Sequence, residues 1–231
     1  MGNTEIFLDK YRQLESAIRA EYRIDSNTSP VYYLMNSPSF RSIRAELDYC
    51  REVRNLLSHT PKINQGFGVE PSKELITLLD ETIHKIQNPV RARQIAIPRG
   101  SVLCKSLDDF VLPTMRDMDE KVYTHVPILQ NDVVCGVFSE NTVLSYLVDE
   151  EIVCIDKTMR FSDLTNYLPL DKHRAESFRF ASINAPIGEI SELFERALKD
   201  TDRIGMVFLT SNGKPNEKLL GILTAWDIAG L

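Results

Sequence analysis

The sequence predicts an α+β protein in which an N-terminal helical bundle is followed by a tandem pair of β-α-β-β-α repeats. Apolar residues recur at helical spacing through the first 90 residues, and β-branched runs begin only after Pro98. The order of strand, turn and helix signals then occurs twice. We therefore expect a helical domain at residues 1–92, a first repeat at 93–150 and a second repeat at 151–231.

Four helices are expected in the first domain, and turn residues mark their ends. Ser29-Pro30 suits a helix start, since Ser can cap and Pro fits the first helical position. Thr60-Pro61 and Asn88-Pro89 stop the third and fourth helices. The expected helices cover residues 5–24, 31–36, 39–58 and 71–87.

The two repeats share one order of elements. In each, a short strand leads into a helix, at 106–118 or at 187–199, and a hairpin follows. The first hairpin turns at Asn131-Asp132, a two-residue turn signal, and the second passes through residues 211–213. A helix that starts at Ser or Thr ends each repeat. We expect the two hairpin sheets to pack face to face and to bury six apolar strand residues: Val126, Ile128, Val137, Val207, Leu209 and Ile222.

Composition and charge exclude several classes of function. Residues 1–98 carry 13 Lys and Arg against 12 Asp and Glu, whereas residues 99–231 carry 14 against 21. The acidic second part is a poor partner for nucleic acid, so any RNA contact is expected in the helical domain. The four cysteines lack the spacing of a zinc site and are expected to be buried thiols. No phosphate-binding loop, dinucleotide turn, serine elbow or paired metal carboxylates are present, and no apolar run is long enough for a membrane helix.

The end of the second repeat resembles the signature of the cystathionine-β-synthase (CBS) domain. Residues 221–227 read Gly, two apolar residues, Thr, two variable residues and Asp. Over roughly residues 95–231 the chain is similar to the tandem pair of that family, the Bateman module, which binds adenine nucleotides or related adenosyl ligands between its repeats. The resemblance implies that Asp227 contacts the ribose hydroxyls and that Thr224 lies near the phosphates. The other reading of both residues is a helix cap that binds nothing.

The resemblance also implies that the segment entering the second repeat packs against adenine. That segment consists of Ser182, Ile183, Asn184, Ala185 and Pro186, with Asn184 where the family usually has a hydroxyl. In the first repeat, Thr142 stands where the family has its Asp. At most one adenosine site is therefore expected.

Near the end of the third helix, Arg54, Asn55 and His59 form the pattern Arg-Asn-x-x-x-His. The pattern is similar to the motif of the HEPN superfamily, helical-bundle domains that often dimerise and in many members cleave RNA without metal. An imidazole can move a 2′-hydroxyl proton, and a guanidinium can stabilise charge on a phosphate. The alternative is a solvated helix face that has no catalytic role. His84, His125 and His173 show no pattern that assigns them chemistry.

These patterns favour a cytoplasmic regulatory protein, a homodimer without metal, that senses an adenosine-type ligand and controls its helical domain. AMP, ADP, ATP and S-adenosylmethionine are the expected ligands, none of them a required cofactor. A non-catalytic protein is favoured. The alternatives are a ligand-gated, metal-independent endoribonuclease and a structural dimerisation protein that binds no ligand.

Overall fold

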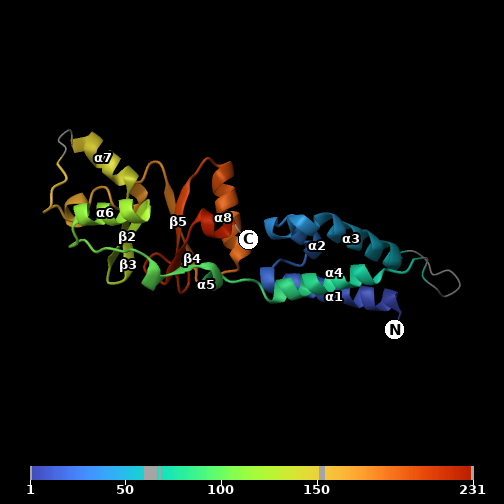
Figure 1. Cartoon of the computed structure of the whole chain (residues 1–231). Helices are drawn as coiled ribbons and strands as arrows, with labels where there is room; N and C mark the ends of the chain where they lie inside the picture. The colour runs from blue at the N-terminus through green and yellow to red at the C-terminus, as the bar shows by residue number, and fades with distance from the viewer. Residues whose placement is uncertain (1, 60–66, 68, 151–153, 230–231) are drawn as a thin grey trace. The chain divides into compact units, whose positions relative to one another are not determined.

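The computed structural model describes residues 2–59, 67, 69–150 and 154–229, and the chain divides into two compact units (Figure 1). Unit 1 comprises residues 1–89 and unit 2 comprises residues 90–231. The division falls at Pro89, where the last helix of unit 1 has ended. Residues 90–92, which the sequence assigns to the helical domain, belong to unit 2 because Ala92 is buried in its core.

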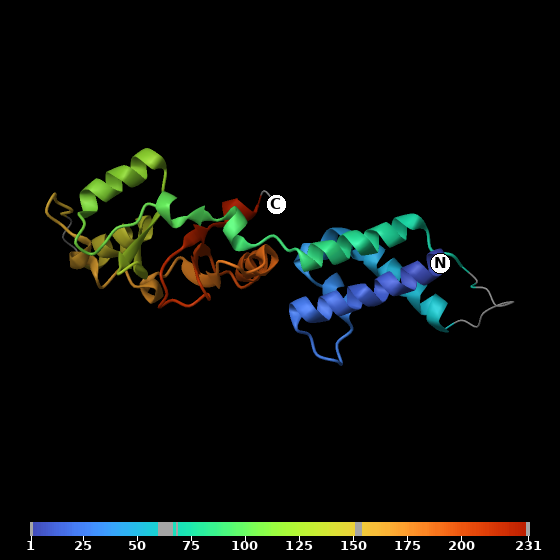
Figure 2. The same ribbon diagram turned by 90° about the horizontal axis from the view of Figure 1, so that it is seen from below.

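Unit 1 is helical throughout its regular structure. Helix α1 packs along α4, and α2 contacts both α1 and α3 (Figures 1 and 2). Side chains three or four positions apart on α1, among them Phe7, Tyr11, Leu14 and Ile18, form one buried stripe that meets the other helices. The elements are α1 (Asn3–Tyr22), α2 (Pro30–Met35), a 3₁₀ helix (Pro38–Ile43), α3 (Arg44–His59) and α4 (Lys73–Gln87).

The helix starts follow the capping signals, with one exception. Pro30 occupies the first position of α2, and the Ser72 Oγ at the start of α4 accepts a hydrogen bond from the Leu75 amide. The single helix expected at 39–58 is wrong in its first turns. Those residues form the 3₁₀ helix, whose first residue is Pro38, and α3 begins at Arg44.

Unit 2 contains the repeated β-α-β-β-α order predicted from the sequence. Its larger sheet has the strand order β1-β6-β5-β4, and β2 pairs with β3 in a second sheet. Strands β4 and β5 are parallel and the other named pairs are antiparallel. The bounds are α5 (Ala92–Ile95), β1 (Ile97–Pro98), α6 (Val111–Lys121), β2 (His125–Gln130), β3 (Val133–Ser139), α7 (Glu140–Glu150), β4 (Ser177–Ser182), α8 (Ile187–Lys199), β5 (Ile204–Thr210), β6 (Gly221–Leu223) and α9 (Ala225–Ile228). Short 3₁₀ helices cover Arg99–Ser101, Phe161–Leu164 and Leu170–Lys172.

The first repeat departs from the expected elements at its start. Its first strand is reduced to one parallel bridge between Lys105 and Ile128. The helix expected at 106–118 begins at Val111 instead. The reason is local: Asp109 accepts hydrogen bonds from the amide and hydroxyl of Ser106, which forms a separate turn before the helix.

The hairpin turn of the first repeat is confirmed. Asn131 and Asp132 both have positive φ, 53° and 65°, as a two-residue type I′ turn requires. In the second repeat, β5 and β6 are joined by the longer segment 211–220, in which Gly213 has a φ of 78°.

All six predicted core residues are buried, but only two of them pack in the cluster shared by the two repeats. That cluster contains Val137 and Ile222 together with Met206 and Phe208. The other four pack within their own repeats: Val126 and Ile128 in the first, Val207 and Leu209 in the second. Strand side chains alternate between two faces, so residues such as Val207 and Phe208 cannot share a core.

Candidate functional site

A cavity of about 810 Å³ is lined by both repeats of unit 2. The first repeat contributes residues 122–125 and 139–141, and the second contributes residues 176, 203–206 and 224–226. The cavity thus contains the starts of both terminal helices, α7 and α9. Its size falls within the range of about 300–1,000 Å³ that is usual for small-molecule sites.

The second-repeat end of the cavity is built around Thr224. This residue directly follows β6, and both its amide and its hydroxyl donate to Asp227 Oδ2, at 2.7 and 2.8 Å. The contacts match a capping box, so the structure confirms that Thr224 and Asp227 form a helix cap. Among the residues that the structure describes, Asp227 Oδ1 has no hydrogen-bond partner.

Aromatic side chains and one cation complete the lining. Trp226 is 89% exposed, and Tyr123 from the other repeat is also exposed. Arg203 lies at the same cavity, and no ion pair or side-chain hydrogen bond engages its guanidinium within the described part of the chain. Val122, also in the lining, has a φ of 57°, an unfavourable conformation for a β-branched residue.

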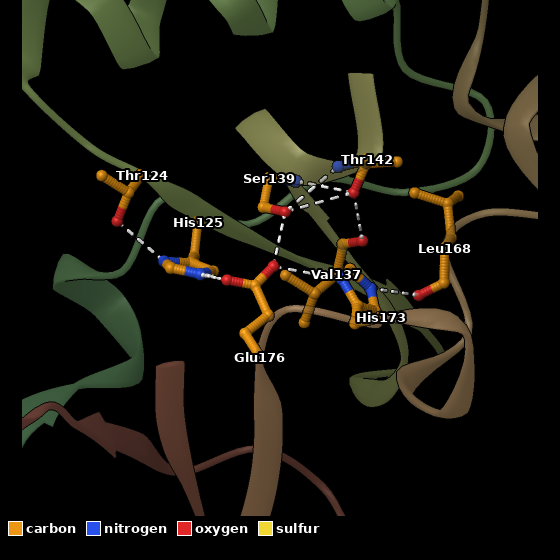
Figure 3. A network of polar contacts seen from close by, with 8 residues as sticks. All are labelled: Thr124, His125, Val137, Ser139, Thr142, Leu168, His173 and Glu176. Atoms are coloured by element: carbon orange, nitrogen blue, oxygen red, sulfur yellow. Dashed lines mark hydrogen bonds and ion pairs between the residues drawn. The ribbon is translucent and has the colours of Figure 1, made fainter. Parts of the chain in front are cut away.

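A buried carboxylate, Glu176, lies in the cavity wall between two histidines (Figure 3). His125 Nε2 is 2.5 Å from Glu176 Oε2, and His173 Nδ1 is 3.2 Å from Glu176 Oε1. The Ser139 hydroxyl donates to the same Oε1 at 2.7 Å. The side chain of Glu176 is 3% exposed. Glu176 precedes β4, whereas His125 begins β2 and Ser139 ends β3, so this network joins the two repeats.

Hydrogen bonding determines the charge state of this carboxylate. Burial acts to raise the pKa of Glu176, but hydrogen bonds from His125, His173 and Ser139 oppose it and together hold the pKa well below its ordinary value. His173 Nε2 lies 3.3 Å from the Leu168 carbonyl oxygen, which can only accept. Each ring nitrogen of His173 therefore faces an oxygen that accepts, Nδ1 the Glu176 carboxylate and Nε2 the Leu168 carbonyl.

The predicted segment 182–186 does not line this cavity. Ser182 and Ala185 line a separate cavity of about 460 Å³. The polar groups of the segment bind the chain that enters unit 2: Ile183 and Ala185 accept at their carbonyl oxygens from the amides of Arg93 and Ala92. Asn184 Oδ1 accepts from the Arg93 guanidinium. The structure thus separates this segment from Thr224, although the resemblance placed both at one ligand.

In unit 1, the structure brings together two of the three residues of the Arg-Asn-x-x-x-His pattern. Arg54 donates to Asn55 Oδ1 at 3.2 Å, and its guanidinium lies 5.7 Å from the centre of the Tyr11 ring. His59 is exposed at the end of α3, and no bond joins it to Arg54 or Asn55 in the part of the chain that the structure describes. Catalysis, RNA binding and the homodimer at this face stay predictions.

The histidine network was not predicted from the sequence. Neither His125 nor His173 belongs to a sequence motif. Glu176 lies 51 residues from His125 along the chain, so no short spacing indicates that the two side chains meet. The expectation of four buried thiols is confirmed only for Cys50. Cys104 is partly buried, and Cys135 and Cys154 are exposed. Cys135 lies between two buried residues on β3, where side chains alternate between the two faces. Within the described residues, no group of three or more His, Cys, Asp or Glu could hold a metal ion, and no helix is long and apolar enough to cross a membrane.

Comparison with known proteins gives matches only among solved structures. No protein-family model matches the chain, and no curated protein sequence matches it. The similar structures include several proteins described by their CBS domains.

Three of the similar structures illustrate the range of the matches. CbpB in complex with c-di-AMP is 11% identical, with 67% of this chain and 91% of that chain covered and a TM-score of 0.49. A putative acetoin utilization protein from Vibrio cholerae is 14% identical, with 62% and 90% covered and a TM-score of 0.45. A CBS domain pair in complex with 5′-methylthioadenosine and S-adenosylmethionine is 10% identical, with 62% and 95% covered and a TM-score of 0.42.

Proposed function

We propose that unit 2 is a sensor that binds an adenosine-type ligand between its two repeats and that ligand binding regulates unit 1. The cavity lined by both repeats carries this proposal. The cavity offers two exposed aromatic rings, Tyr123 and Trp226, on which a nucleotide base can stack. Asp227 belongs to α9, whose first residues line the cavity, and its Oδ1 has no hydrogen-bond partner among the described residues. The Arg203 guanidinium suits the anionic part of a nucleotide.

The segment 182–186 has a supporting role in this proposal. Its carbonyl groups hold residues 92–93, which lead into β1, and β1 pairs with β6 directly before Thr224. A ligand that moves Thr224 would therefore act on the strand pair that joins the cavity to the connection with unit 1. Such coupling requires the ligand to prefer one arrangement of that connection, because equal affinity for two states shifts neither.

An endoribonuclease with Arg54, Asn55 and His59 at its active site is the alternative effector function of unit 1. A guanidinium that contacts both Asn55 and Tyr11 is held in place, as a structural or a catalytic arginine would be. A ligand-free dimerisation protein is the other alternative, and a failure to bind any nucleotide would favour it.

The test of the sensor compares two carboxylates that accept the same pair of hydrogen bonds. Asp109 accepts from the amide and hydroxyl of Ser106 at 2.6 and 2.9 Å, as Asp227 does from Thr224, but Ser106 does not line the cavity, whereas Thr224 does. In calorimetric titrations with AMP, ADP, ATP and S-adenosylmethionine, Asp227→Ala should weaken binding about 10- to 150-fold, the loss of a charge-assisted hydrogen bond of about 1.5–3 kcal/mol.

Asp109→Ala should retain the affinity of the wild type, because it loses only the turn with Ser106, which lies outside the cavity. Equal losses in the two variants would mean that Asp227 acts through helix stability alone. The absence of binding by the wild type to all four compounds would refute the proposed function.

A further inference from the structure

The two repeats supply a carboxylate to equivalent helix starts in different ways. In the second repeat, Asp227 of the same helix accepts from the amide and hydroxyl of Thr224. In the first repeat, the equivalent of Asp227 is the neutral Thr142, whose Oγ1 accepts from the Ser139 amide at 3.0 Å. The Ser139 hydroxyl donates instead to Glu176, which comes from the segment before β4. A carboxylate from the second repeat thus replaces the one that the first repeat lacks.

Glu176 occupies the polar groups with which the first repeat could otherwise bind the anionic group of a ligand. Ser139, His125 and His173 all direct a polar atom at Glu176 (Figure 3). The Glu176 side chain lines the cavity and is 3% exposed. The start of α7 also favours negative charge through the helix dipole. The first-repeat end of the cavity therefore already holds a carboxylate, with three hydrogen-bond partners.

Each helix start therefore carries one carboxylate. Asp227 comes from the helix itself, whereas Glu176 comes from the other repeat. A ligand anion at the first-repeat end would face the charge of Glu176 directly, so Glu176 excludes it from that end of the cavity.

We propose that Glu176 is a built-in occupant of the anion-binding end of the first repeat and keeps the anionic groups of a ligand away from that end of the cavity. The ligand part of this inference rests on the proposed function. The role of Glu176 as an occupant does not, and it can be tested with a carboxylate alone.

The first experiment is chemical rescue of Glu176→Ala in the full chain. Removal of the carboxylate leaves two imidazoles and a hydroxyl around a hole that acetate can fill. We expect Glu176→Ala to melt at least about 5 °C below the wild type, and acetate to restore much of that loss in a concentration-dependent way. Sodium chloride at the same ionic strength should not restore it.

Glu217→Ala is the matched control for rescue. Glu217 accepts two hydrogen bonds from Asn212, both at 2.7 Å, but it is only partly buried and lies outside the cavity. Acetate should therefore leave its melting temperature unchanged relative to chloride. If acetate stabilises the two variants equally, or fails to stabilise Glu176→Ala, Glu176 is not an occupant of an anion site.

A second variant covers the case in which Glu176→Ala does not fold. Thr142→Asp places in the first repeat the carboxylate that the second repeat has. It should stabilise the Glu176→Ala chain and destabilise the wild type, where it adds a charge next to Glu176. If Thr142→Asp raises the melting temperature of the Glu176→Ala chain and lowers that of the wild type, the two carboxylates serve one position. If it shifts both melting temperatures in the same direction, the inference is overturned.

Titration of the folded variants then separates the two proposals. The wild type should bind one nucleotide per chain, and Glu176→Ala should bind phosphate or a second nucleotide in addition. If the wild type binds no nucleotide, the proposed function is refuted. The acetate rescue then still tests whether Glu176 occupies an anion site. A wild type that binds two nucleotides per chain refutes the selectivity assigned to Glu176 and leaves the sensor in place.

Discussion

Gly136→Ala should destabilise unit 2 strongly, because the backbone of another segment occupies the space a side chain needs. A Cβ at Gly136 in β3 would lie 2.6 Å from the Leu168 carbonyl oxygen and 2.8 Å from the Leu168 Cβ. The same carbonyl accepts from the Val137 amide at 2.9 Å, so it cannot retreat without loss of that bond. Overpacking of this kind typically costs about 1–3 kcal/mol. Since the contact is with backbone, we expect about 2–3 kcal/mol.

The assay is thermal unfolding of the full chain, followed by calorimetry. For a chain of this size the expected cost lowers the melting temperature by about 4–12 °C. Gly100→Ala is the control, because a Cβ there meets no atom within 4 Å. The His173 ring also contacts the Leu168 carbonyl, so the displacement should extend to the Glu176 network. A Gly136→Ala melting temperature within about 1 °C of the control would refute the reasoning.

Two further predictions concern the carboxylate network and the core between the repeats. The pKa of Glu176 is lower in the folded chain than in the unfolded one, so the folded state binds fewer protons there and stability from this group is lost as the pH falls. In urea unfolding, the advantage of the wild type over Glu176→Gln should be largest near neutral pH and shrink below about pH 4.3, the ordinary pKa of Glu; an advantage that grows in acid would contradict this. Phe208→Ala should cost about 3–5 kcal/mol, because the ring is fully buried and lies 5.2 Å from Phe180 between ring centres. Leu198→Ala, at a 77% exposed residue, should cost far less, and similar losses in urea unfolding would exclude a core role for Phe208.

Local signals in the sequence were sufficient for most elements of the fold. The turn at Asn131 and Asp132 needs two residues that tolerate positive φ, and both have it. Helix α8 covers the predicted residues 187–199, because its apolar spacing is interrupted at neither end. Helix α6 begins late because Asp109 binds Ser106, and the sequence alone does not show which Ser and Asp will form a turn.

The arrangement between elements was harder to predict. Alternation along β5 shows that Val207 and Phe208 face opposite ways, but not which face meets the other repeat. Thr224 and Asp227 were predictable as a pair because they are three residues apart on one helix. The approach of His125 to Glu176 depends on how two repeats pack, and no spacing in the chain records it.

The pairing of β1 with β6 makes the first repeat an insertion within the second. Ile97 pairs with Ile222, and Ala92 is buried in the second-repeat core, although both residues precede every strand of the first repeat. During synthesis, residues 92–98 leave the ribosome long before their partners exist. The core of the first repeat is complete at Leu168, so that repeat can fold before β6 has been synthesised. The first strand of unit 2, β1, can therefore pair only after β6, the last strand of the chain, has been synthesised.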